Sequence, residues 1–196
     1  MAEITLELIQ QLRDRTGLGL MDCKKALIEA NGDVEQAIIL LRKRGAAIAE
    51  KRGGNVTSEG LVHAYIHPGA RVGVLVEINC ETDFVARTDE IAQFARDIGM
   101  HVAAFRPMYV NSSEVDPALV EKERSIYKEQ LTGKPANIVD QIIEGKLQKF
   151  YGEICLVNQP FIKNDKLTVD DVLKELMAKL GENIKIRRFV RFEVGA

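Results

Sequence analysis

The sequence contains no tryptophan, and Phe, Tyr and Trp together make up only 6% of its 196 residues. So few aromatic side chains argue against a protein that stacks nucleobases on exposed rings. Lys and Arg number 27 and Asp and Glu 29, which gives a formal net charge of -2. Proteins that bind duplex nucleic acid through its phosphates are usually basic, so the charge disfavours a nucleic-acid-binding function.

Long apolar runs are also missing. No stretch reaches the roughly 18 apolar residues that a membrane-spanning helix needs, and the acidic start of the chain lacks the apolar region of a secretory signal. The cysteines are odd in number and far apart, at Cys23, Cys80 and Cys155. This pattern is typical of reduced structural thiols, so we expect a cytoplasmic protein that does not associate with membranes.

Residues 1–54 predict a helical head followed by a basic linker. Apolar residues recur at helical spacing in three stretches that turn residues separate. We expect Asn31-Gly32 and Gly45 to end the second and third helices, and Asp33 to cap the third at its start. Lys51–Asn55 is basic and rich in glycine, and the change in composition at Gly53-Gly54 marks the domain boundary. Three such short helices bury only a small core, which favours a docking module over a catalytic site.

Residues 55–196 predict an α+β core domain that begins with a hairpin. Two apolar series alternate with more polar residues on either side of a turn at His67–Ala70: Val62, Ala64 and Ile66, then Val72, Val74, Val76 and Ile78. We expect both series on one face of the hairpin, where an amphipathic helix over residues 89–105 covers them.

The rest of the core adds helices and a third strand. Residues near 108–150 predict a helical excursion, rich in Glu and Lys, that is partly exposed. Thr168 with Asp171 predicts the capped start of a further helix, and residues 184–194 alternate as a strand. The predicted fold is therefore α+β, with the helical head followed by a small antiparallel three-stranded sheet backed by helices.

Enzyme motifs are not found. The sequence has no phosphate-binding loop, and the three histidines do not have the spacing of metal ligands, so we expect no cofactor, no metal and no enzyme. One acidic cluster, Glu81, Asp83, Asp89 and Glu90, has two interpretations. It could hold Mg²⁺ or perform acid–base chemistry, or Asp89 and Glu90 simply occupy the first turn of a helix. For Glu81 and Asp83 both interpretations stay open.

Phe84 lies beside Asp83 between the predicted hairpin and the next helix. No periodic apolar partner accounts for it. A phenylalanine in a loop either fills the core or is exposed as an aromatic anchor for a partner protein. The sequence around Phe84 leaves both interpretations open.

The segment Thr82–Arg87 resembles the signature of the elongation factor Ts family. Leu12–Leu27 is similar to the opening of the family, and Asn31-Gly32-Asp33, His67–Val76, Gln159-Pro160-Phe161 and Gly181–Phe189 also match it in order. The resemblance thus covers nearly the whole chain. It implies a translation elongation factor of protein biosynthesis, one that exchanges the guanine nucleotide of elongation factor Tu.

The resemblance also implies how the chain would act. The head would be a ubiquitin-associated-type module, and head and core would bind mainly the GTP-binding domain of elongation factor Tu in its GDP-bound form. The partner would lose Mg²⁺ and GDP so that GTP can bind, without a covalent step. Dislocation of Mg²⁺ is implied for Thr82, Asp83, Phe84 and Val85, and other partner contacts for Arg13, Leu20, Met21, Lys24, Arg52 and His67. The family often has Met at the position of Leu20, and Leu at this position keeps the surface apolar.

The chain departs from longer family members, which carry two related core subdomains. A single core suggests that two chains could pair as a homodimer. Two other functions would also suit parts of the sequence. The head alone would suit an adaptor that binds ubiquitin, and Glu81, Asp83 and Asp89 would suit a Mg²⁺-dependent hydrolase.

Overall fold

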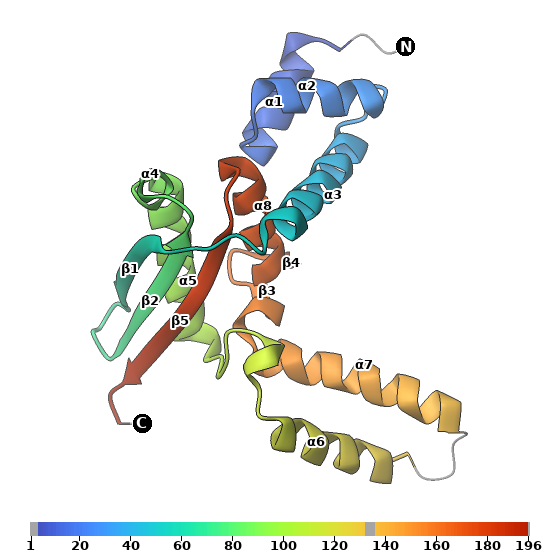
Figure 1. Cartoon of the computed structure of the whole chain (residues 1–196), viewed down its shortest axis with the longest axis vertical. Coiled ribbons are helices and arrows are strands. Elements are labelled where there is room, and N and C mark those ends of the chain that lie inside the picture. The colour runs from blue at the N-terminus through green and yellow to red at the C-terminus, as the bar shows by residue number, and fades with distance from the viewer. Residues whose placement is uncertain (1–3, 132–135, 196) are drawn as a thin grey trace. The chain divides into compact units, whose positions relative to one another are not determined.

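The computed structural model describes residues 4–131 and 136–195, so residues 132–135 of the predicted excursion lie outside the described residues. It confirms a mixed fold of helices and a small antiparallel sheet (Figure 1). The chain forms two compact units. The first comprises the described residues of Met1–Gly60, Asn79–Glu90 and Leu173–Lys185, and the second those of Leu61–Ile78, Ile91–Val172 and Ile186–Ala196. No helix among the residues described is both long and apolar enough to cross a bilayer.

The head consists of α1 (Leu6–Thr16), α2 (Leu20–Glu29) and α3 (Val34–Arg52). Thr5 caps α1, and Asp33 caps α3 as predicted, because its side chain accepts a hydrogen bond from the Gln36 amide. The three helices bury one small apolar cluster: Ile9, Leu12, Cys23, Ala26, Leu27, Ala37 and Leu41. The three predicted helices are therefore confirmed.

The prediction that α3 ends at Gly45 is wrong, because the helix continues to Arg52. Gly45 is buried within the helix, and a Cβ placed there would lie 3.0 Å from the Cβ of Ala178 in α8 (Val169–Leu180). Glycine at this position permits close approach of the two helices rather than ending one of them. The residues that follow, Ala46–Arg52, are mostly good helix formers.

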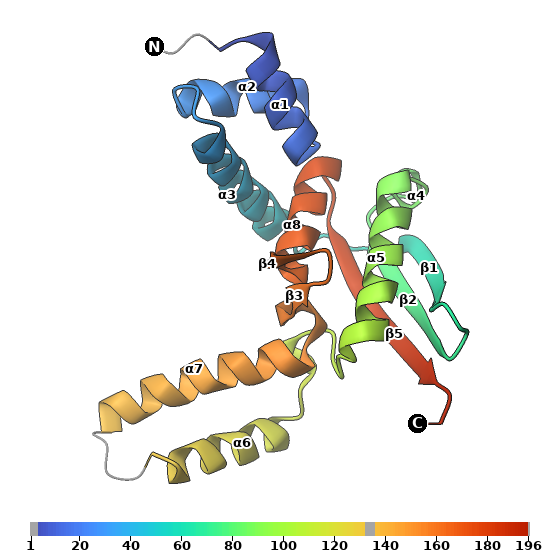
Figure 2. The same cartoon turned by 180° about the vertical axis from the view of Figure 1, so that it is seen from behind.

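The main sheet has the order β1 (Glu59–Ile66), β2 (Val72–Cys80) and β5 (Ile184–Glu193). In the second unit, α5 (Asp89–Phe105) lies along one face of this sheet, behind β2 in Figure 1 and in front of the strands in Figure 2. The approach is close, since a Cβ on Gly99 would lie 2.7 Å from the Cβ of Tyr65. Of the predicted inward residues on β2, Val74, Val76 and Ile78 are buried and Val72 is half-buried.

On β1 the predicted covered face is wrong. Val62 and Ile66 are 67% and 62% exposed, whereas Leu61, His63 and Tyr65 are half-buried. Both faces of β1 carry apolar side chains, so alternation alone did not show which face α5 covers. The other face of the sheet consequently exposes several apolar side chains: Val62, Ile66, Leu75, Val190 and Phe192.

The excursion is a helical hairpin, α6 (Pro117–Glu129) and α7 (Ala136–Ile154), that follows the short helix η1 (Ser112–Glu114). It has an apolar cluster of its own, made of Leu131, Val139, Ile143 and Leu147. Arg124 of α6 and Glu144 of α7 form an ion pair at 2.7 Å. The predicted helical excursion is therefore confirmed as partly exposed, with a small apolar cluster of its own.

A second sheet of two antiparallel strands was not predicted. It pairs β3 (Pro160–Phe161) with β4 (Asn164–Thr168), after the short helix η2 (Leu156–Asn158). The predicted start of α8 is confirmed, because Thr168 and Asp171 exchange hydrogen bonds between each side chain and the other's amide.

His101 is fully buried at the end of α5. Its Nε2 lies 2.9 Å from Oε1 of Gln159, and its Nδ1 lies 3.3 Å from the Ile162 amide, which donates to it. The imidazole therefore donates through Nε2, and it stacks on Phe105 with 4.6 Å between ring centroids. Burial lowers the pKa of His101. These contacts give His101 a structural role.

The cysteines are buried and free, in agreement with the prediction of structural thiols: Cys23, Cys80 and Cys155. Burial raises the pKa of Cys155 to about 11. The pKa of Cys80 is raised by the same cause. Both thiols are therefore protonated and poorly reactive near neutral pH.

Candidate partner-binding site

The segment between β2 and α5 forms one turn of helix, α4 (Asp83–Ala86), where a loop was predicted. Thr82 caps this turn in an extended conformation, and its Oγ1 accepts a hydrogen bond from the Val85 amide at 3.4 Å. The Cys80 thiol donates to the Thr82 carbonyl at 3.1 Å. Backbone and side-chain contacts of Thr82 thus define where α4 begins.

Phe84 is the most exposed large apolar side chain of the described residues, with 82% of its surface accessible. Of the two interpretations of Phe84, the structure therefore supports the exposed aromatic and contradicts the core residue. An aromatic ring in this position loses contact with water only when another molecule covers it. Such rings are enriched among the residues that dominate protein–protein binding energy.

Asp83 lies beside Phe84 and forms an ion pair with Arg87 at 3.0 Å. The side chains are 45% and 80% exposed for Asp83 and Arg87 respectively. Exposed ion pairs of this kind contribute about 0–1 kcal/mol because water and salt screen them. The Asp83 carboxylate can therefore leave Arg87 for a donor on a partner at little cost.

Glu81 precedes this turn and is held by three other residues. Its carboxylate accepts hydrogen bonds from the Asn183 amide at 2.6 Å, from Nδ2 of Asn55 at 3.0 Å and from Arg52 at 3.2 Å. The hydrogen bond from the Asn183 amide is the main cause that lowers the pKa of Glu81, and Asn55 and Arg52 act in the same direction. Arg52, expected as a partner contact, is thus placed next to the Thr82–Val85 segment.

Glu182 contacts the same segment and was not predicted as a site residue. Its carboxylate accepts from the amides of Glu81 and Thr82 at 3.2 and 3.1 Å, and from the Thr82 hydroxyl at 2.6 Å. The contact joins positions 101 residues apart, so periodicity could not reveal it. Two signals were available: Glu182 and Asn183 come directly after Gly181, where α8 has ended, and the segment Gly181–Phe189 resembles the family.

The head residues expected to contact the partner are exposed on α1 and α2. Leu20 and Met21, at the start of α2, are 43% and 61% exposed. Lys24 is exposed one turn after Leu20, so the structure brings these side chains together on α2. Arg13 is exposed in the last turn of α1.

His67 belongs to the second unit and lies in the turn between β1 and β2. Its side chain is exposed, and Nδ1 lies 3.1 Å from the hydroxyl of Tyr65. The imidazole is thus accessible at the tip of the hairpin.

The acidic cluster has the contacts of structural groups. Glu81 is bound by Arg52, Asn55 and Asn183, and Asp89 occupies the first turn of α5, where the helix dipole favours acids. Within residues 4–131 and 136–195, no group of three or more His, Cys, Asp or Glu side chains could hold a metal ion. These contacts give no support to the interpretation as a hydrolase site.

Comparison with known proteins gives a consistent result over almost the entire chain. The family model described as Elongation factor TS matches residues 5–196. A protein named Elongation factor Ts from Carboxydothermus hydrogenoformans is 58% identical over 194 residues, which cover 98% of this chain and 89% of that one. Proteins with the same name from Thermoanaerobacter sp. (strain X514) and Thermotoga sp. (strain RQ2) are 57% and 52% identical, over 98% of this chain and 95% and 97% of theirs. The chain therefore belongs to the elongation factor Ts family.

Proposed function

We propose that this chain is the guanine nucleotide exchange factor of elongation factor Tu in the cytoplasm. It binds the GDP-bound factor, displaces Mg²⁺ and promotes release of GDP so that GTP can bind. Membership of the family supports this function. The observation that carries the proposed mechanism is the exposed ring of Phe84, on a short helical turn next to an available carboxylate.

An exchange factor acts by binding the nucleotide-free partner more tightly than the loaded one. GTPases hold GDP through a phosphate cradle and a bridging Mg²⁺. By linkage, a factor that weakens nucleotide binding is itself bound more weakly in the presence of nucleotide, by the same ratio. A coupling of about 4 kcal/mol corresponds to about a thousandfold change in affinity.

Phe84 and Asp83 supply this coupling. Insertion of the Phe84 ring between elements of the partner favours a rearranged packing, because packed interiors switch between discrete arrangements. The Asp83 carboxylate, which only accepts hydrogen bonds, holds donors that the rearrangement displaces. Val85 and Thr82 fix the turn that carries both. No covalent step is needed, so the chain acts without being an enzyme.

The remaining contacts anchor the partner. We assign the head to the ubiquitin-associated type of three-helix module, which docks on the GTP-binding domain through Leu20, Met21 and the neighbouring cations. Arg52 and His67 add polar contacts. The exposed apolar side chains at the start of α2 support this role for the head.

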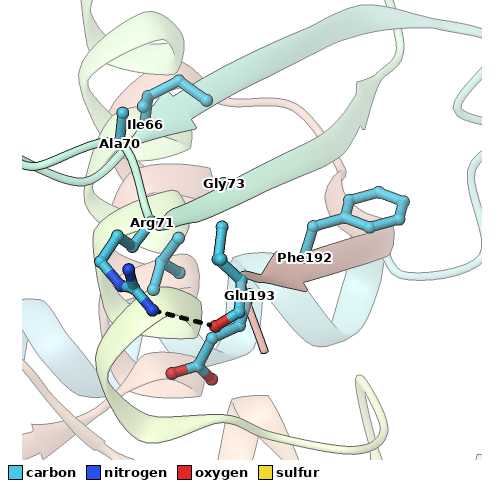
Figure 3. A pocket seen from close by; sticks show the side chains of 8 residues that line it. Ile66, Ala70, Arg71, Gly73, Phe192 and Glu193 are labelled. Atoms are coloured by element: carbon cyan, nitrogen blue, oxygen red, sulfur yellow. Dashed lines mark hydrogen bonds between the residues drawn. The ribbon is translucent and has the colours of Figure 1, made fainter. Parts of the chain in front are cut away.

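We also propose that two copies of the chain associate, since a single core offers each binding surface once. The support is the uncovered face of the sheet, whose exposed apolar side chains suit an identical face of a second copy. Figure 3 shows one end of the sheet, where Ile66 and Phe192 flank Gly73 and Arg71 donates to the Val194 carbonyl at 3.4 Å. Sedimentation velocity should give a dimer that Phe192→Asp converts to a monomer. A wild-type monomer at all concentrations would refute the pairing.

Stopped-flow release of fluorescent GDP from elongation factor Tu tests the main proposal. Addition of the chain should accelerate release by orders of magnitude, and excess Mg²⁺ should slow it. An unchanged rate would overturn the proposed function. Two further assays separate the rivals, since an adaptor would capture ubiquitin and a hydrolase would turn over a phosphate ester with Mg²⁺.

A further inference from the structure

We propose that Glu182 is a positioning residue that fixes the helical turn carrying Phe84 before any partner binds. This inference rests on the proposed function and assigns a role to a residue outside the Thr82–Val85 segment. It predicts that the turn acts as a prepared structure rather than as a loop that orders on contact.

The geometry of the Glu182 carboxylate carries the proposal. One oxygen accepts two consecutive amides, those of Glu81 and Thr82, at 3.2 and 3.1 Å. The other oxygen accepts the Thr82 hydroxyl at 2.6 Å. Hydrogen bonds to a charged acceptor are stronger than those between neutral groups. Glu182 therefore fixes the direction of the backbone as it enters α4.

The contact is reciprocal. While Glu182 accepts from the backbone of Glu81, the carboxylate of Glu81 accepts from the backbone of Asn183 at 2.6 Å. Asn183 is 1% exposed, and its side chain donates to the Asn55 carbonyl at 2.8 Å. The turn is thus held by the connection between α8 and β5 and by the segment that follows α3.

None of the four residues of α4 is buried, so hydrogen bonds and not packing determine where the turn lies. The Phe84 ring is exposed, so it does not pack against the chain that carries it. The Ala86 amide donates to the Thr82 carbonyl at 3.2 Å. The acceptor of this hydrogen bond thus belongs to Thr82, the residue that Glu182 holds. A turn fixed in advance loses less conformational entropy when its ring inserts into the partner, so it favours the rearranged, nucleotide-releasing state without a new contact.

Fluorescence of residue 84 tests the positioning directly and needs no partner. The chain contains no tryptophan, so Phe84→Trp adds the only indole. In time-resolved anisotropy, Glu182→Ala should increase the amplitude of fast motion of this indole. Glu182→Gln should largely restore the rigid signal, because its carbonyl oxygen can still accept both amides. The matched control Glu144→Ala, which removes an ion pair between α6 and α7, should leave the signal unchanged.

Exchange kinetics test the consequence. With saturating amounts of the chain, Glu182→Ala should slow GDP release from elongation factor Tu about ten- to a hundredfold, which corresponds to about 1.4–2.8 kcal/mol. Glu182→Gln should recover most of the rate. In a Phe84→Ala background, Glu182→Ala should have almost no additional effect, since both changes act through one ring. Thermal melts followed by circular dichroism identify any variant that has lost its fold.

The outcomes separate the two proposals. The positioning role is overturned if indole motion is unchanged in Glu182→Ala. It is also overturned if the effects of Glu182→Ala and Phe84→Ala on the activation free energy of GDP release simply add. If the wild-type chain does not accelerate GDP release, the proposed function fails, while the anisotropy result still decides whether Glu182 fixes the turn.

Discussion

Replacement of Phe84 by alanine should separate function from stability. The side chain is 82% exposed, so its loss removes little buried surface and should change the free energy of unfolding by no more than about 0.5 kcal/mol. Truncation of an aromatic anchor in a protein interface typically costs about 2–4 kcal/mol. At 1.4 kcal/mol per tenfold, GDP release from elongation factor Tu should be about thirty- to a thousandfold slower.

Stopped-flow release of fluorescent GDP at saturating chain measures this loss, and urea unfolding measures stability in parallel. Met108→Ala is a suitable control, because Met108 is also an exposed apolar side chain, at 65%, but lies outside the proposed contacts. Phe84→Leu should give an intermediate rate, since it keeps apolar volume without the ring. A wild-type rate in Phe84→Ala would refute the insertion mechanism.

Two further predictions concern stability. Because burial lowers the pKa of His101, the unfolded chain binds a proton below pH ~6.5 that the native chain excludes, so the free energy of unfolding should decrease as pH falls through this value. Urea unfolding at neutral and mildly acidic pH measures the slope, which His101→Gln should reduce; an equal slope would contradict the assignment. Gly99→Ala, whose Cβ would lie 2.7 Å from the Cβ of Tyr65, should destabilise the chain by about 1–3 kcal/mol. Gly145→Ala in α7, whose Cβ would meet nothing within 4 Å, should stabilise the chain by about 0.5–1 kcal/mol. Urea unfolding of both variants checks the pair, and a free energy of unfolding that changes in the same direction in both would contradict the close packing at Gly99.

Local patterns predicted the elements with strong signals. The apolar stripe of residues 89–105 gave the bounds of α5, and the Thr168–Asp171 pair gave the start of α8. Both signals depend on neighbours within a turn or two of helix, which the sequence displays directly. Short strands such as β3 have too few residues to show a period, and β3 was not found.

Tertiary contacts decided what the sequence could not. From the sequence alone Gly45 predicts the end of a helix, because the packing of Ala178 against it is a contact between residues far apart in the sequence. The apolar residues on both faces of β1 conceal which side α5 covers. At the candidate site the segment Thr82–Val85 could be identified by resemblance, but the exposure of Phe84 and the contact with Glu182 depend on the folded chain.

The burial of all three cysteines has a practical consequence. Thiols buried inside the fold react slowly with maleimides and other alkylating reagents, so the native chain behaves toward such reagents almost as though it had no cysteine. One cysteine introduced on the surface would then accept a dye selectively, without removal of the natural ones. With a second such cysteine, one dye on the head and one on the sheet would report the distance between them during nucleotide exchange in single molecules.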